Sequence, residues 1–272
     1  MKILHIIDSA GLYGAEIMLL SLCQEQKQAG CRPVICSIRE MNEREMSLED
    51  EARRRGLDSI TFHMQDGPNL LGAYRIMQYA RADKYDILHS HGYKSNILFG
   101  FIPSFIRKIP IMSTLHGWTH VNEMSKLALY AYIDAFSLRF MDAICVVNET
   151  MLDHPRLKGN KVKGRMYFIP NGIPLQPETV QFQEDDIIRF SRDAFTIVSI
   201  GRLSAEKRHR DLIDAFALLA RTAGDVRLLI IGEGPERNFL ERQVRQMNLV
   251  DRVMLPGYRD SAWRYLRYCR AF

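Results

Sequence analysis

Two cations flank a short loop in the stretch SIGRLSAEKRHRDLIDAF, residues 199–216. Arg202 and Lys207 follow an apolar run that ends in Gly201, and they precede a segment with helical patterning. An arginine fork binds phosphate bidentately and a lysine adds a compact charge, so the pair could hold a diphosphate without a metal ion. A solvated basic turn is the alternative, and Arg208 and Arg210 are expected to form such a solvated face.

Glycine-rich loops follow three other apolar runs. In SAGLYGAE, residues 9–16, Gly11 and Gly14 would let the backbone at a helix start approach an anion, unless they serve only a tight turn. In IIGEGPER, residues 230–237, glycines would let a nucleotide lie against the backbone, and Pro235 is expected in the first helical turn. The backbone of LPGYRD, residues 255–260, could read the edge of a base.

Histidine precedes glycine at the ends of two predicted strands, in HSHGYKSN (89–96) and TLHGW (114–118). His91 and His116 could hydrogen-bond a sugar hydroxyl or transfer a proton, although a structural hydrogen bond is an equal alternative. His89 is expected to be structural. No carboxylate or cysteine accompanies these histidines at ligand spacing, so a zinc site is not predicted. Asn-Gly in IPNGI, residues 169–173, favours a tight turn when taken alone.

These residues need a scaffold that brings the ends of strands together, and the element order predicts one. Apolar β-rich runs alternate with helical patterns along almost the whole chain, and runs such as KILHII and AICVVN are continuously apolar. This pattern is typical of parallel strands covered by helices on both faces. The class is therefore α/β with doubly wound sheets. Helices are predicted at 15–30, 44–56, 69–82, 94–108, 123–141, 208–222, 235–247 and 261–270.

Two domains are expected, an N-terminal domain over 1–180 and a partial C-terminal domain over 181–272. The polar segment 171–194 is interpreted as the connection between them, and its acidic run 184–186 as a solvated charge run. Only about three strands follow this segment, whereas a Rossmann-like domain has five or six. The second domain is therefore expected to be incomplete.

The composition sets broad limits on the function. The 272 residues are 47% hydrophobic and 25% charged with a net charge of +5, and no stretch interleaves aromatic and basic residues as a nucleic-acid platform does. The five cysteines are scattered and form no CxxC pair, so neither a disulfide framework nor a zinc site is indicated. Because no signal peptide or membrane span is evident, a cytoplasmic protein is predicted.

Taken together, the motifs resemble those of glycosyltransferase family four, the retaining GT-B transferases that use nucleotide sugars. The resemblance rests on GLYGAE, DILHSHG, STLHG, VVNE, IPNGI, IGRLSAEKRHRDLIDAF, LLIIGEGPER and RVMLPGYRD, in that order. These motifs span nearly the whole chain. The resemblance implies a GT-B fold of two Rossmann-like domains.

Roles for individual residues follow from the resemblance. Arg202 and Lys207 would hold the donor diphosphate, Gly14 would bring the first-domain loop close to it, and His116 would lie near the transferred sugar. His91 would lie on the acceptor side of the cleft, and Asn171 and Gly172 would lie near the interdomain cleft. The nucleotide would be lined by Glu233, Gly234, Pro235, Gly257, Tyr258 and Arg259. No cofactor is implied, since the nucleotide sugar is a co-substrate and the two cations replace a metal.

The chain also departs from the family pattern. The family's EX7E element is expected beyond the third strand of the second domain and has no place in this sequence, and Pro174 replaces an acidic residue after the Asn-Gly-Ile turn. The final helix that crosses back onto the first domain is also missing. The resemblance therefore implies a truncated transferase.

The implied reaction is transfer of a hexose from a UDP- or GDP-sugar to a glycan or a lipid-linked acceptor. The apolar helix 123–141, together with Lys94, Arg107 and Lys108, could meet a membrane, although core packing is the favoured interpretation of this helix. The expected location is cytoplasmic, with peripheral contact at the inner face of the membrane. A nucleotide-sugar 2-epimerase of the same fold and an inactive nucleotide-sugar-binding fragment are the alternatives.

Overall fold

The computed structural model describes residues 1–8, 11–41, 47–65, 67, 69–117, 126–157, 165–172, 184–259 and 261–272. It divides the chain into two compact units, Met1–Gln176 and Pro177–Phe272. Each unit is described separately below.

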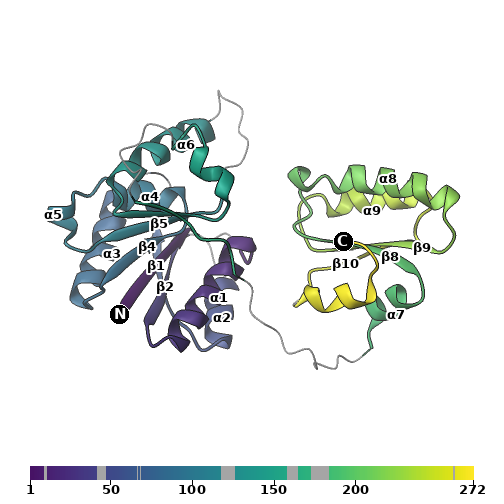
Figure 1. The fold of residues 1–272 in the computed structure, drawn as a ribbon, viewed down its shortest axis with the longest axis horizontal. Helices are drawn as coiled ribbons and strands as arrows, with labels where there is room; N and C mark the ends of the chain where they lie inside the picture. Colours follow the sequence, from purple (N-terminus) through teal and green to yellow (C-terminus); the bar gives the residue numbers. More distant parts are fainter. Residues whose placement is uncertain are drawn as a thin grey trace. The chain divides into compact units, whose positions relative to one another are not determined.

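The first unit is built on a seven-stranded sheet in which all neighbouring strands are parallel (Figure 1). Its order is β3-β2-β1-β4-β5-β6-β7, so the direction of winding reverses between β1 and β4. In open parallel sheets, this reversal creates a crevice at the carboxyl ends of the strands. The strands are β1 Lys2–Asp8, β2 Arg32–Glu40, β3 Asp58–Met64, β4 Ile87–Ser90, β5 Ile111–Leu115, β6 Ala143–Val146 and β7 Met166–Phe168.

Helices cover both faces of this sheet, which confirms the predicted α/β class (Figure 1). Successive strand residues alternate between two cores: Ile7 packs with α1 and α2, whereas Ile6 packs with α3 and α4. This is why the strands read as continuously apolar. The helices are α1 Gly14–Gln28, α2 Ser47–Arg54, α3 Leu70–Ala82, α4 Tyr93–Gly100, α5 Ser104–Arg107 and α6 Lys126–Ser137, with 3₁₀ turns η1 Leu138–Phe140 and η2 Glu149–Asp153.

The single helix predicted over 94–108 is instead two helices, α4 and α5. Pro103 separates them, because proline has no amide hydrogen to donate and its ring disfavours a helical conformation for the residue before it. The interpretation of Arg107 as a membrane-facing cation was also wrong. Arg107 is 1% exposed, and its guanidinium donates to Asp142 Oδ2 at 2.6 Å. Lys94 pairs with Asp8 at 3.3 Å.

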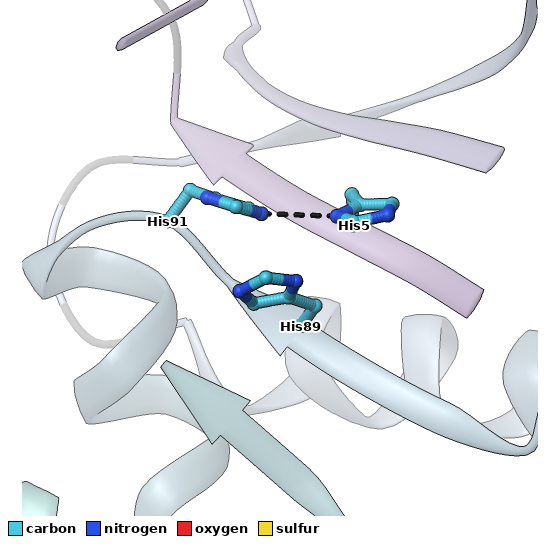
Figure 2. A group of neighbouring side chains, drawn as sticks. All are labelled: His5, His89 and His91. Atoms are coloured by element: carbon cyan, nitrogen blue, oxygen red, sulfur yellow. Dashed lines mark hydrogen bonds between the residues drawn. The ribbon is translucent and has the colours of Figure 1, made fainter. Parts of the chain in front are cut away.

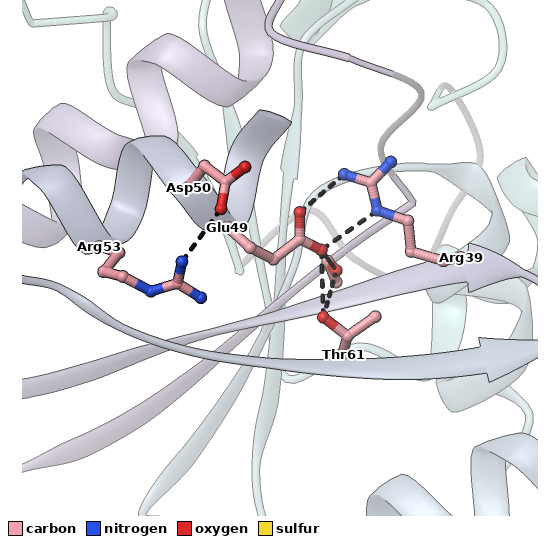
Figure 3. A network of polar contacts seen from close by, with 6 residues as sticks. Arg39, Glu49, Asp50, Arg53 and Thr61 are labelled. Atoms are coloured by element: carbon pink, nitrogen blue, oxygen red, sulfur yellow. Dashed lines mark hydrogen bonds and ion pairs between the residues drawn. The ribbon is translucent and has the colours of Figure 1, made fainter. Parts of the chain in front are cut away.

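A buried ion pair fixes α2 to the sheet (Figure 3). Arg39 of β2 donates to both carboxylate oxygens of Glu49, at 2.8 and 3.1 Å, and Ser37 and Thr61 donate hydroxyl hydrogen bonds to the same carboxylate. Burial alone would raise the pKa of Glu49, but the hydrogen bonds from Arg39 and Ser37 outweigh it and lower the pKa. The sequence EDEARRRG reads as a charged helix face. That is true of Asp50 but wrong for Glu49, which is 2% exposed.

The second unit has a three-stranded parallel sheet in the order β10-β9-β8. One face packs on α8 and α9, and the other on α7 and η4. The elements are α7 Asp186–Arg192, β8 Phe195–Ile200, η3 Ala205–Lys207, α8 His209–Thr222, β9 Val226–Ile231, α9 Arg237–Gln246, β10 Val253–Gly257 and η4 Ala262–Tyr268.

The acidic run 184–186 is not merely a solvated charge run. Asp185 caps α7 by accepting the backbone N–H of Ile188 at 3.0 Å, and it accepts the Tyr265 hydroxyl at 2.7 Å. It therefore ties the start of this unit to its last described turn. Of the other sequence motifs, Pro174 and most of the basic loop 156–165 lie outside the described residues. Among the described residues, none of the helices is both long and apolar enough to cross a membrane.

Candidate active site

Three loops meet at the carboxyl ends of β8, β9 and β10 and are joined through their backbones. Leu203 donates its amide to Glu233 O at 2.9 Å, and Gly232 donates its amide to Gly257 O at 3.0 Å. A Cβ atom on Gly232 would stand 1.9 Å from Gly201 O, and one on Gly234 would stand 2.3 Å from Leu203 O. The absence of side chains at these glycines thus lets the neighbouring loop approach closely, and contact of this backbone with a nucleotide stays a prediction.

Arg202 and Lys207 lie on the first of these loops and are both exposed. Glu206 lies between them in the sequence. The pKa of its carboxyl group is lowered mainly by a hydrogen bond from the Ser204 hydroxyl, and the charges of Arg202 and Lys207 lower it further. The two predicted phosphate ligands therefore share one electrostatic environment just before α8. Their role in donor binding stays a prediction.

His209, the first residue of α8, was not recognised in the sequence. It is 2% exposed, and its Nε2 lies 3.3 Å from the Ser199 hydroxyl. Its Nδ1 has no hydrogen-bond partner among the described residues. Burial first and the charge of Lys207 second lower its pKa, so the imidazole is neutral at pH 7. His209 thus has one buried nitrogen, unpartnered within the described part of the chain, at the start of α8 and within the influence of the Lys207 charge.

The two arginines that flank His209 in the sequence both form ion pairs within the second unit. Arg210 is exposed as predicted, and its guanidinium also pairs with Glu236 at 2.5 Å and lies over the Phe239 ring at 3.6 Å, which links α8 to α9. Arg208 is exposed as expected and pairs with Asp211.

The two other loops of the second unit also approach each other. Glu233 pairs with Arg237 at 2.5 Å, and a Cβ on Gly257 would stand 2.7 Å from Glu233 Oε1. Tyr258 is half-exposed beside them, and Arg259 donates to its carbonyl at 3.1 Å. Pro235 lies before the helix, which begins at Arg237, and not in its first turn as predicted. The predicted nucleotide ligands thus come from two loops that touch.

In the first unit, His91 and His116 line one cavity of about 190 Å³ at the ends of β4 and β5. Tyr93, Tyr130, Asp134 and Arg156 line it too. The sequence placed both histidines at equivalent strand ends, and the structure brings them together, with His91 Nδ1 3.4 Å from His116 Nε2.

A buried polar cluster supports the wall of this cavity. Asn96 donates to Asp134 Oδ1 at 2.8 Å and accepts the hydroxyls of Ser90 and Ser113 at 2.6 and 2.7 Å. All four side chains are buried. Such a satisfied network gives the cavity a rigid wall.

His5 joins the site from the middle of β1, where the apolar run KILHII gave no sign of a functional group. It lies opposite His89 in the parallel register, and its Nδ1 is 3.0 Å from His91 Nε2 (Figure 2). Its Nε2 is 2.7 Å from Gln26 Oε1. His89 is held by Thr114 Oγ1 at 2.8 Å, a structural contact.

Burial keeps these imidazoles neutral. It lowers the pKa of His5 to about 4 and the pKa of His116 below its usual value. For His89 and His91, burial is again the main cause and neighbouring histidines add to it, which puts the pKa of each well below the usual range. A neutral imidazole has one N–H donor and one acceptor nitrogen.

His5, His89 and His91 have the composition of a metal site, since one ligand atom from each lies within 4.8 Å of the others. However, both nitrogens of His5 and of His91 face protein partners, and His89 Nε2 faces Thr114. A metal would have to take lone pairs that these hydrogen bonds already use. The arrangement fits hydrogen bonding better than metal ligation.

The remaining predicted residues of the first unit lie elsewhere. Asn171 and Gly172 line a different, largely apolar cavity of about 340 Å³, together with Gln26 and His89. Gly14 begins α1, and a Cβ there would meet nothing within 4 Å, so packing does not require glycine at this position. Whether these residues face the second unit stays a prediction.

Comparison with known proteins gives two family matches. The profile of Glycosyltransferase Family 4 matches residues 13–177, and that of Glycosyl transferases group 1 matches residues 180–272. These ranges together cover almost all of the chain.

Individual relatives agree with the family matches. The chain is 25% identical over 194 residues to the N-acetyl-alpha-D-glucosaminyl L-malate synthase of Bacillus anthracis, covering 70% of this chain and 50% of that protein. It is 25% identical over 221 residues to the UDP-Gal:alpha-D-GlcNAc-diphosphoundecaprenol alpha-1,3-galactosyltransferase of Escherichia coli, covering 77% and 56%. The chain thus spans about half the length of these curated relatives.

The fold itself has solved counterparts. A crystal structure of Anabaena HepE in complex with UDP-glucose matches with a TM-score of 0.76 at 19% identity, over 99% of this chain and 72% of that one. This likeness confirms the predicted GT-B fold.

Proposed function

Because the chain belongs to glycosyltransferase family 4, we propose that it acts in the transfer of a hexose from a UDP- or GDP-sugar to a glycan or lipid-linked acceptor. We further propose that the transfer retains the anomeric configuration and needs no metal ion. The names of the two curated relatives, which describe transfer of N-acetylglucosaminyl and galactosyl groups, support this reaction class.

The start of α8 is the observation that carries the proposal. Arg202, Lys207 and the unpartnered Nδ1 of His209 gather where a helix of 14 residues presents its unpaired amides. Cations and helix amino ends together suit a diphosphate, and they stabilise the charge that develops on it as it leaves. This charge stabilisation is what a bound metal would otherwise supply.

The other residues receive complementary roles in the proposal. Glu233, Gly234, Pro235, Gly257, Tyr258 and Arg259 would line the nucleotide, and Gly14, Asn171 and Gly172 would lie along the donor. His116 would contact the transferred sugar, and His91 would lie on the acceptor side of the cleft. The reaction forms a bond from the acceptor oxygen to the anomeric carbon on the face from which the diphosphate departs. The diphosphate takes the bonding electrons and the acceptor's proton.

An exposed apolar surface on the first unit supports a lipid-linked acceptor. Phe101, Phe136 and Phe140 are exposed and lie with ring centroids 5.7 to 6.0 Å apart, and Phe105 and Tyr132 are more exposed still. Aromatic side chains with Lys108 and Arg139 nearby in sequence suit the interface of an anionic bilayer. This surface supports our proposal that the reaction takes place at the inner, cytoplasmic face of the membrane.

A donor screen with variants tests the proposal. Melting is followed with UDP, GDP and their sugars, and transfer is measured with lipid-linked acceptors in the presence of EDTA. We expect one nucleotide sugar to raise Tm, and Arg202→Ala or Lys207→Ala to lose about 10²- to 10³-fold in transfer. Arg221→Ala, an exposed change late in α8, is the matched control.

Other outcomes of these measurements would contradict particular parts of the proposal. Near-normal transfer in either cation variant would refute the diphosphate assignment. Loss of activity in EDTA, restored by a divalent ion, would refute metal independence. Conversion of UDP-GlcNAc without acceptor would indicate an epimerase, and binding without turnover would indicate an inactive binding fragment.

A further inference from the structure

Four side chains form a continuous line of hydrogen bonds between two cavities of the first unit. Gln26 lines the 340 Å³ cavity, and His91 and His116 line the 190 Å³ cavity. The fully buried His5 stands between Gln26 and His91 in this line, and Figure 2 shows its contact with His91. The successive separations are 2.7 Å from Gln26 Oε1 to His5 Nε2, 3.0 Å from His5 Nδ1 to His91 Nε2, and 3.4 Å from His91 Nδ1 to His116 Nε2.

The amide oxygen at one end determines the direction of every bond in this line. A carbonyl oxygen can only accept, so His5 must donate from Nε2 and accept at Nδ1. His91 must then donate from Nε2 to His5, which leaves its Nδ1 to accept from His116. Each neutral ring carries one proton, and the line is consistent only when all three protons are on Nε2.

We propose that Gln26, His5 and His91 are positioning residues that hold His116 in the Nε2–H form, so that its Nδ1 accepts a hydrogen bond from a hydroxyl of the sugar. This inference rests on the proposed function of His116 as a sugar contact. It adds that specificity at this position is for a hydroxyl donor, because the available nitrogen carries no proton.

The surroundings of the line support this assignment. Burial depresses the pKa of all three imidazoles, so their neutral forms predominate at pH 7. His89 packs against His91 and His5 with ring centroids at 4.1 and 4.9 Å, and its Nε2 is engaged with Thr114. It restrains the rings without joining the line.

The first test measures the tautomers directly and needs no catalytic activity. The chain is labelled with ¹⁵N-histidine, and its eight imidazoles are assigned by single substitutions. In the unmodified protein at pH 7, we expect a protonated Nε2 and an unprotonated Nδ1 for His5, His91 and His116. We also expect a scalar coupling across the hydrogen bond between His91 Nε2 and His5 Nδ1.

The second test removes the oxygen that sets the direction. Gln26→Leu should give His116 a mixture of tautomers, whereas Gln28→Leu, an exposed change at the end of the same helix, should not. In serine proteases, losing the partner that sets a histidine tautomer costs about 10⁴-fold in kcat. Because Gln26 acts through two intervening rings, we expect a smaller loss of about tenfold, in kcat more than in KM.

Several results would overturn the proposal. A proton on Nδ1 of any of the three rings in the unmodified chain would do so, as would an unchanged His116 spectrum in Gln26→Leu. Stoichiometric Zn²⁺ that shifts His5, His89 and His91 together would also overturn it, because a metal would occupy the same lone pairs. Since the spectra do not depend on turnover, failure of this inference and failure of the transfer reaction are distinguishable.

Discussion

The two units place their candidate chemistry in opposite environments. In the first, neutral imidazoles are buried between strand ends and are held by other side chains. In the second, cations are exposed on loops whose backbones hold one another. The difference matches the proposed tasks, since hydroxyl recognition needs fixed neutral partners and a leaving diphosphate needs accessible positive charge. The stability of the two units should accordingly depend on different interactions.

The largest expected effect is loss of the buried ion pair in the first unit. Glu49→Leu leaves Arg39 charged and without its carboxylate, which should lower the free energy of unfolding of this unit by about 3–5 kcal/mol. Asp50→Ala on the same helix breaks only the exposed pair with Arg53 and should cost less than about 1 kcal/mol. Denaturant unfolding, monitored by hydrogen-exchange mass spectrometry, measures the stability of each unit separately. Equal losses of stability in the two variants would show that burial of the ion pair does not determine its contribution to the stability of the unit.

The corresponding change in the second unit acts on the backbone. Gly232 has φ +152°, and Gly232→Ala would place its methyl group against the Gly201 carbonyl. We expect a loss of about 2–3 kcal/mol in the second unit alone. Gly224→Ala, where a Cβ meets nothing within 4 Å, is the control. A stable Gly232→Ala protein with unchanged exchange in the three loops would show that close backbone contact is not required.

Acid should destabilise the first unit more than the second. The pKa of His5 is about 4 in the folded chain and about 6.5 when unfolded, so between these values the unfolded chain binds more protons. Its contribution to stability is therefore complete above pH 6.5 and is lost as pH falls, by up to about 1.4 kcal/mol per pH unit. His89, His91 and His116 shift in the same direction. The first unit should open first on acidification, and simultaneous opening of both would contradict this.

The smallest expected effect concerns the contact between α8 and α9. Arg210→Ala removes a pair with Glu236 and a stacking contact with Phe239, and should lower the stability of the second unit by about 1 kcal/mol. Arg208→Lys keeps the exposed charge near Asp211 and should change little. Thermal unfolding of both variants measures the difference. An Arg210→Ala protein as stable as the parent would show that the contacts with Glu236 and Phe239 do not stabilise this unit.

The proposed membrane contact would provide a further contrast between the units. Phe105→Ser with Tyr132→Ser should weaken flotation of the chain with phosphatidylglycerol vesicles, whereas Phe272→Ser in the second unit should not. Equal binding by all variants would refute the apolar surface of the first unit as the contact.

Prediction from sequence succeeded where local pattern and topology coincide. His91 and His116 end neighbouring parallel strands, and parallel strand ends meet at one edge of a sheet, so their proximity could be predicted. His5 could not be predicted, because a histidine in an apolar strand looks like any other buried residue until its neighbours are known. His209 was not recognised because it stands between basic residues in the sequence, and their charges dominated the interpretation of this stretch. Glu49 was placed on a charged helix face because charge pattern alone does not show burial. The contacts of the exposed Arg210 with Glu236 and Phe239 could not be predicted, because they depend on how α9 packs beside α8.

By itself, the sequence determined the alternation of strands and helices, the family, and the presence of two cations before α8. These depend on local periodicity and on motifs that are contiguous in the chain. Only the tertiary structure decided which neutral rings join His116 and which carbonyls occupy the space at Gly232 and Gly234. Those contacts join residues from different strands and loops, and a hydrogen bond between them depends on distances that no local pattern encodes.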